Sequence, residues 1–327
     1  MDTTKTAIII CFTLALIGGT KAQQAAQTSL YYFNKYTITP AYVGLDDQII
    51  LDANIRQQWS GLIGAPKTQT ITAHAPVGIM HGGIGLIIQN QTIGAHKQTA
   101  AKISYAYHQQ INRNATLSIG ISSGILSYTL LGDQLRTPDG NYENGVPDHQ
   151  DNTLPTTTIS QIAPVTDLGL YYQSPKFQTG IGIQHINTST IKFDPMNFGN
   201  IGIKRNYFAI FAAEFELASS WKILPSLLCK TDMAQWQTDL SILTQRNDNI
   251  YFGLSFRGYN AQSIDALAFL GGVFINDQLF IQYAYDLPLS ALRAVQTGSH
   301  EIGIKYRLNG SVGNGKLPGV IYNPRHL

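Results

Sequence analysis

The chain has 327 residues, a formal net charge of +2 and only 13% charged residues, about half of what soluble domains carry. It has no run of basic residues, which argues against a nucleic-acid partner. After its first residues it has no apolar stretch long enough for a membrane helix, which needs about twenty residues.

The N-terminus predicts a secretory signal peptide over residues 1–22. Lys5 supplies a positive start, Ala7 to Ile17 is apolar, and Thr20-Lys21-Ala22 offers a small-residue cleavage site. An uncleaved anchor is the alternative, but the apolar run is too short to span a bilayer. Cleavage would leave Cys229 as the single cysteine, which excludes a fold stapled by internal disulfides.

Residues 23–47 form a stretch rich in Gln, Tyr and Asn, in which apolar and polar residues follow no regular spacing. We expect this stretch to be an N-terminal hatch inside or beneath the domain that follows. A disordered terminus is the other interpretation of the same composition.

Residues 48–308 show a repeated alternation of apolar and polar side chains. In the last segment, Ile302 and Ile304 share a face with Tyr306, opposite Glu301 and Lys305, which is the period of a β-strand. About fourteen segments follow this pattern: 48–58, 67–77, 81–91, 97–108, 115–128, 166–173, 175–186, 203–215, 219–230, 234–245, 248–258, 263–275, 278–286 and 299–308. We therefore predict an all-β fold, a transmembrane antiparallel β-barrel of about 14 strands in contact with the lipid bilayer. A soluble β-sandwich would explain the alternation but not the low charge.

The connections alternate in length. The long ones, at about 59–66, 129–165, 187–202 and 287–298, all follow odd-numbered strands. Outer-membrane barrels have short periplasmic turns and long external loops. We expect the bacterial outer membrane as the location, with both termini periplasmic.

Charged side chains on the predicted strands fall on one face, which we assign to the lumen. On the lipid face each would cost about 2–4 kcal/mol at the membrane midplane. The predicted lumen charges are Asp52, Arg56, Lys102, Glu214, Lys222, Lys230, Asp239, Arg257, Glu301, Lys305 and Arg307.

Catalytic signatures are absent from the sequence. The stretch from Gly61 to Thr68 superficially suggests a phosphate loop, but Pro66 stands where that motif requires Gly. We predict no enzyme activity, no cofactor and no metal centre. Loop 129–165 offers oxygen ligands of the kind that Ca²⁺ uses: Asp133, Asp139, Asn141, Glu143, Asp148 and Asp151. Calcium binding there stays open beside a solvated polar loop.

Three stretches together resemble one family. They run from Tyr31 to Gly44, from Arg56 to Pro76, and from Tyr285 to Ile302. This combination is similar to the PorP/SprF family of type IX secretion system membrane proteins of Bacteroidetes-type bacteria. The resemblance implies a non-enzymatic outer-membrane barrel that works with periplasmic and outer-membrane components of that system. It also implies export or cell-surface anchoring of a large partner protein, such as a gliding adhesin.

The resemblance gives candidate motif residues with a structural or partner-docking role. They are Pro40, Ala41, Tyr42, Gly44, Trp59, Gly61, Gly64, Ala65, Pro66, Thr68, Gln69, His74, Ser299, His300 and Glu301. Thr39 stands where the family usually has Asn, which puts the hatch conformation in question. Residues 309–327 would be a periplasmic C-terminal tail that either reaches partners or is disordered. The competing function is a porin or a hydrophobic-substrate channel with a plugged lumen.

Overall fold

The computed structural model describes residues 25–142, 147–151, 154–192, 200–260, 263–308 and 310. The signal peptide predicted at 1–22 lies outside the described residues, as does the predicted tail except for Gly310.

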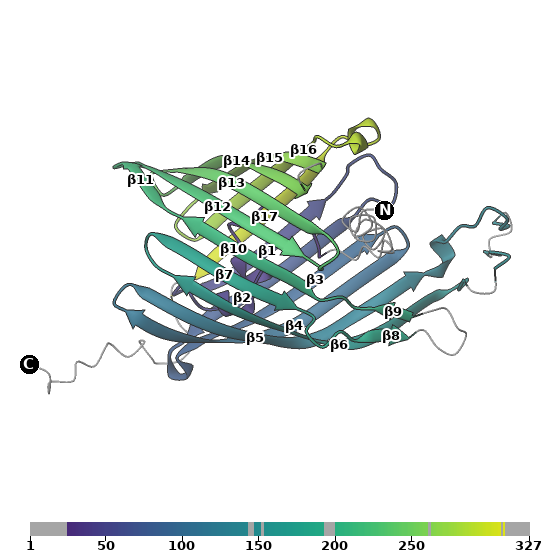
Figure 1. Cartoon of the computed structure of the whole chain (residues 1–327), viewed down its shortest axis with the longest axis horizontal. Coiled ribbons are helices and arrows are strands. Elements are labelled where there is room, and N and C mark those ends of the chain that lie inside the picture. Colours follow the sequence, from purple (N-terminus) through teal and green to yellow (C-terminus); the bar gives the residue numbers. More distant parts are fainter. Residues whose placement is uncertain are drawn as a thin grey trace, which may run out of the picture.

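The described residues form strands and short 3-10 helices (Figure 1). The strands are β1 (Ile49–Gln57), β2 (Lys67–Val77), β3 (Gly82–Ile93), β4 (His96–Asn112), β5 (Ala115–Leu131), β6 (Thr158–Gln173), β7 (Phe177–Gln184), β8 (Thr190–Lys192), β9 (Asn200–Gly202), β10 (Asn206–Ala213), β11 (Phe215–Ala218), β12 (Trp221–Thr231), β13 (Trp236–Arg246), β14 (Ile250–Asn260), β15 (Ser263–Phe274), β16 (Leu279–Pro288) and β17 (Ser299–Leu308). The 3-10 helices are η1 (Lys35–Thr37), η2 (Pro40–Tyr42), η3 (Gly78–Met80), η4 (Gly132–Gln134) and η5 (Ala291–Ala294).

The main sheet closes on itself. Neighbouring strands pair antiparallel in chain order, and β1 pairs with β17 from Ile49↔Leu308 to Gln57↔His300. After the small β8–β9 hairpin, β10 pairs with β7 on one side and with β12 on the other. β11 follows β10 and also pairs with β12. Counting β10 and β11 as one wall strand, the described residues make a closed barrel of fourteen strands. The predicted fold class is confirmed.

Burial follows the alternation of each strand. In β1, Asp52 and Arg56 are buried while Leu51 and Ile55 are exposed. Apolar side chains therefore cover the outside of the wall, and polar side chains point into the lumen. Among the described residues, no helix has the length and apolar character needed to cross a membrane.

The two ends of the barrel differ. The long connections, 58–66, 132–157, 185–205 and 289–298, lie at one end, called here the long-loop end, on the right in Figure 1. The opposite, short-turn end carries turns such as 113–114, 219–220 and 247–249. This is the predicted asymmetry.

Residues 25–46, called here the N-terminal segment, run through the lumen before β1 begins. Tyr36, Ile38 and Val43 of this segment pack in one buried cluster with Ile87 of β3 and Phe208 of β10. Leu30 and Phe33 pack in a second cluster with wall residues of β12 to β16. The core of this barrel therefore lies between the segment and the inner wall.

Candidate functional site

The backbone of the N-terminal segment lies directly against the wall because the facing wall positions are glycines. A Cβ built on Gly120 of β5 would stand 2.4 Å from the backbone nitrogen of Ala41. Gly44 itself has a φ of +81°, and a Cβ there would stand 2.6 Å from the Cα of Gly83. Any larger residue at Gly120 or Gly44 would push the segment away from the wall.

The candidate motif at Pro40–Tyr42 forms η2 inside the lumen. Thr39 caps η2, since its side-chain oxygen accepts from the backbone N–H of Ala41 at 3.4 Å. Threonine at this position therefore still supplies a side-chain cap to η2, although the family usually has Asn there. The hydroxyl of Ser118 on β5 donates to the carbonyl of Ala41 at 2.6 Å, and the N–H of Gly44 donates to Nδ1 of His74 at 3.2 Å. Four of the motif residues therefore meet at one docking point, with His74 on the wall.

Five charged side chains form a buried ion-pair cluster at the other end of the segment. Arg56 lies 2.5 Å from Asp286 and 2.9 Å from Glu301. Arg257 lies 2.6 Å from Asp239 and 2.7 Å from the same oxygen of Asp286. All five side chains are at most 3% exposed. Burying charges is unfavourable unless each is paired, so this cluster depends on the closed barrel that brings β1, β13, β14, β16 and β17 together.

The cluster holds the start of the N-terminal segment. The hydroxyl of Ser29 donates to Asp286 at 2.6 Å and accepts from Arg257 at 2.8 Å and Arg56 at 3.1 Å. The N–H of Ser29 and the hydroxyl of Thr28 each donate to Glu301 at 2.7 Å. Hydrogen bonds to charged groups are the strong ones, so residues 28–29 are firmly attached to the wall.

Several ionisable groups of the segment have shifted pKa values, among them Lys35 and Asp46. Burial lowers the pKa of Lys35 to about 8, and its ammonium stands over the rings of Tyr32 and Tyr42 at 4.6 and 5.4 Å from their centroids. Burial alone would raise the pKa of Asp46. The positive charges of His74, Lys305 and Lys35 outweigh burial, so the pKa of Asp46 lies below its ordinary value.

The other candidate motif residues lie mainly at the long-loop end. The N–H of Trp59 donates to the side chain of Ser299 at 3.1 Å, and Ser60 exchanges backbone hydrogen bonds with Thr297 and Gly298. The loop containing Gly61, Gly64, Ala65 and Pro66 is thereby joined to the start of β17. Thr68 is buried in the lumen.

Two motif residues stand apart from this group. Gln69 and His300 point outward from the wall, where they bond to Asn90 and Tyr283 respectively. The structure therefore divides the candidate residues between a docking point for the segment, a loop junction, the lumen with Thr68 and the ion-pair cluster with Glu301, and the outer face. Their predicted role in partner docking stays a prediction.

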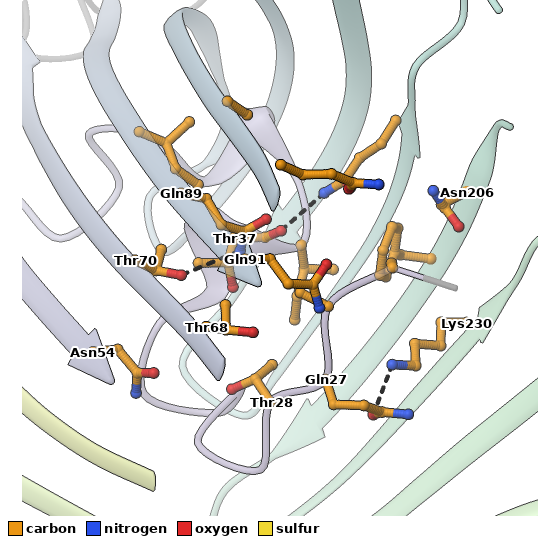
Figure 2. Close-up of a pocket in the computed structure, with 18 of the residues that line it drawn as sticks. Gln27, Thr28, Thr37, Asn54, Thr68, Thr70, Gln89, Gln91, Asn206 and Lys230 are labelled. Carbon is orange, nitrogen blue, oxygen red and sulfur yellow. Dashed lines mark hydrogen bonds between the residues drawn. The ribbon is translucent and has the colours of Figure 1, made fainter. Parts of the chain in front are cut away.

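Two connected spaces open from the long-loop end. The lumen cavity, about 400 Å³, lies between the N-terminal segment and the wall and is shown in Figure 2. The vestibule, about 920 Å³, lies above it between loop tips and includes Trp59 and Trp236. Both spaces are lined by Gln27 and Gln91, so the vestibule leads into the cavity.

Loop 132–157 is organised around one buried histidine. Nε2 of His149 lies 3.1 Å from the carbonyl of Gly132 and 3.0 Å from that of Pro155, and Arg136 stacks on Tyr142. In the part of the chain that the structure describes, no group of three or more His, Cys, Asp or Glu residues is placed to hold a metal ion. Glu143 of this loop lies outside the described residues.

Sequence reasoning missed important members of the site. Ser29 and Lys35 lie in a stretch without a period, so no pattern marked them. Asp286 lies at the end of a well-predicted strand. It shares a face with Gln282 and Ala284, which are both buried, so the alternation of this strand could have placed Asp286 in the lumen.

The chain is similar to one protein family and to several solved structures. The family model described as "Type IX secretion system membrane protein PorP/SprF" matches residues 20–306. The toluene transporter TbuX of Ralstonia pickettii is similar in fold, with 12% identity and a TM-score of 0.49 over 83% of this chain and 92% of that one. A FadL homologue of Pseudomonas aeruginosa has 10% identity and a TM-score of 0.48 over 82% and 92% of the two chains. A search of curated proteins gave no match.

Proposed function

Because this chain belongs to the PorP/SprF family of type IX secretion system membrane proteins, we propose that it is a non-enzymatic outer-membrane barrel that supports export or surface anchoring of a partner protein. The observation that carries this proposal is the family match, which spans the N-terminal segment and almost the whole barrel. The partner would be a large secreted or surface-anchored protein, such as the gliding adhesins that the family resemblance implies.

The proposal gives each end of the barrel a task. The long-loop end would face outward, as in other outer-membrane barrels, and loops 132–157 and 185–205 would contact the exported protein. The short turns and the end of β17 would face the periplasm, where machinery components dock. His149 supports this assignment because a loop held on a buried side chain presents a defined surface.

The N-terminal segment favours an anchor over an open pore. Its side chains pack against the inner wall from the ion-pair cluster to η2 and occupy much of the lumen. An anchor does not need solute flux, and its lumen can be closed permanently.

The test is replacement of residues 133–156 by a short Gly/Ser linker, which leaves β6 intact from Thr158. We expect the variant to fold, shown by heat-modifiable migration in gels, and to lose display of the partner at the cell surface. Replacing residues 291–294, a helix in another loop at the same end, is the matched control and should keep display. Normal display in the 133–156 variant would contradict the role of this loop.

A channel is the second candidate, favoured by the vestibule and lumen cavity that open from the long-loop end. Steady flux of a small solute through the intact barrel in liposomes would support the channel over the anchor.

A further inference from the structure

The lumen cavity has a lining of unusual chemistry for a protein interior. Many of the lining side chains are neutral and can both donate and accept hydrogen bonds. The amides use separate nitrogen and oxygen atoms for this, and each threonine uses one hydroxyl. Figure 2 shows them converging on one space: Gln27, Thr28, Asn54, Thr68, Thr70, Gln89, Gln91 and Asn206. Ile38, Ile87, Phe208 and Leu228 supply an apolar surface in the same cavity. The volume of about 400 Å³ lies within the range of small-molecule sites.

The cavity also holds a lysine ammonium without an ion-pair partner among the described residues, while the carboxylate in its lining, Asp52, lies 4.0 Å from Lys305. Three lysines line it, of which Lys102 pairs with Asp167 at 2.5 Å and Lys204 with Asp232 at 3.5 Å. Within the described residues, no carboxylate oxygen forms an ion pair with Lys230. Lys230 is 7% exposed, and its Nζ donates to the amide oxygen of Gln27 at 2.7 Å.

A bound anion would improve on this arrangement. A carboxylate is a stronger acceptor for an ammonium than an amide oxygen is, and a buried cation gains most from an opposite charge. Gln27 would then be released from Lys230, while its amide nitrogen still donates to the amide oxygen of Gln237.

The rest of the lining indicates which class of molecule would bear the anionic group. A ring of amides and threonines matches hydroxyl groups, which also donate and accept. The apolar surface of Ile87 and Phe208 suits the C–H face of a sugar ring. We propose that the lumen cavity binds a sugar acid, with its carboxylate on Lys230 and its hydroxyls on the amide and threonine side chains. The ligand enters through the vestibule, and this assignment does not depend on a role in secretion.

The experiment is isothermal titration calorimetry of the full-length barrel in detergent micelles with four probes: D-glucuronate, its uncharged methyl ester, D-glucose and acetate. We expect glucuronate to bind about tenfold or more tightly than the methyl ester, as loss of one charged hydrogen bond predicts. Acetate, which lacks the hydroxyls, should bind weakest or not at all.

Variants separate the two parts of the site. Lys230→Met should weaken glucuronate about tenfold without changing the affinity for glucose. Gln89→Leu and Asn206→Leu should weaken glucuronate and glucose alike. Lys176→Met, in an exposed turn between β6 and β7, is the matched lysine control and should change nothing.

The proposal is overturned if glucuronate does not bind, if the ester binds equally well, or if acetate binds as tightly as glucuronate. It is also overturned if folded Lys230→Met keeps the wild-type affinity. Should Lys230→Met fail to fold, the comparison of acid and ester on the wild-type barrel and the Gln89→Leu variant still decide the question.

Discussion

Arg56 illustrates how individual lumen charges hold this barrel together. Its guanidinium contacts Asp286, Glu301 and the hydroxyl of Ser29, and it is 2% exposed. Removing one member of a buried pair leaves the other charge unpaired in a low-dielectric environment. We expect Arg56→Leu to lower the free energy of unfolding by about 3–5 kcal/mol, measured by urea unfolding of the barrel reconstituted in lipid vesicles.

The control for Arg56 is an ion pair of the same kind in a more exposed place. Lys222 lies 2.9 Å from Glu214, and both side chains are about a third exposed. Pairs in such positions contribute about 0–1 kcal/mol, so Lys222→Leu should leave the unfolding midpoint almost unchanged. Equal losses for the two variants would show that burial does not govern the Arg56 contribution.

Lys35 makes the stability of the N-terminal segment depend on pH. Its pKa is about 8 in the folded protein because of burial, against 10.5 in the unfolded chain. Between these values the unfolded chain binds the extra proton, so stability rises with pH. From pH 7.5 to 9.5 we expect Lys35 to contribute a gain of roughly 2 kcal/mol in the free energy of unfolding.

Tyrosines limit the pH range in which Lys35 can be tested. Burial raises the pKa of Tyr31 to about 12, so above pH 10 its ionisation favours the unfolded chain and stability falls again. The gain in the free energy of unfolding between pH 7.5 and 9.5, measured by urea unfolding, should therefore be the same for the wild type and for Lys67→Met, an exposed lysine, and about 2 kcal/mol smaller for Lys35→Met. An identical pH response in Lys35→Met would refute the assignment to Lys35.

At the scale of elements, the cost of placing a charge on the outer wall should depend on the depth of that position in the membrane. Ile242 on β13 and Ile111 at the end of β4 are 54% and 56% exposed, but Ile242 lies mid-strand and Ile111 beside a short turn. Arginine on the lipid face costs about 2–4 kcal/mol at the midplane and about 0–1 near the interface. Ile242→Arg should therefore destabilise the barrel in vesicles far more than Ile111→Arg, measured by urea unfolding. Similar costs at both positions would contradict a membrane-spanning orientation.

Strands were the most predictable elements because their lumen and lipid faces differ in polarity at every second residue. β17 was expected at 299–308 and spans Ser299–Leu308. β6 was expected from 166 but begins at Thr158, where Ser160 and Pro164 interrupt the alternation. The β8–β9 hairpin was not predicted, since strands of three residues are too short to show a period.

The candidate site was only partly predictable, for a different reason. Alternation assigned charges to the lumen, and Asp52, Arg56, Lys230 and Glu301 are indeed buried there. Their pairing could not be predicted, because Arg56 and Asp286 meet only once β1 has closed on β17 and brought β16 alongside. The contacts of Ser29 and Lys35 depend in turn on the whole wall being in place.

Considered as a whole, the molecule is a barrel whose interior is largely occupied by its own N-terminal segment. Fourteen strands enclose enough space for a plug, and here the segment supplies the buried apolar side chains that a water-filled lumen would lack. The wall and the segment are therefore one folding unit, and the lumen cavity and the vestibule open at the long-loop end.

This arrangement predicts that the intact barrel does not conduct. Below the lumen cavity, Tyr36, Ile38 and Tyr42 pack against the wall in a continuous cluster, which leaves no room for a hydrated solute to pass. We expect no swelling of liposomes containing the full-length barrel in arabinose, and swelling when residues 25–46 are deleted. Since that deletion also removes packing partners of the wall, deletion of residues 25–30 alone is the milder variant, and it should stay closed because η1 and η2 remain. Swelling with the intact chain would mean that the segment moves aside spontaneously, and the channel would then replace the anchor as the better account of this barrel.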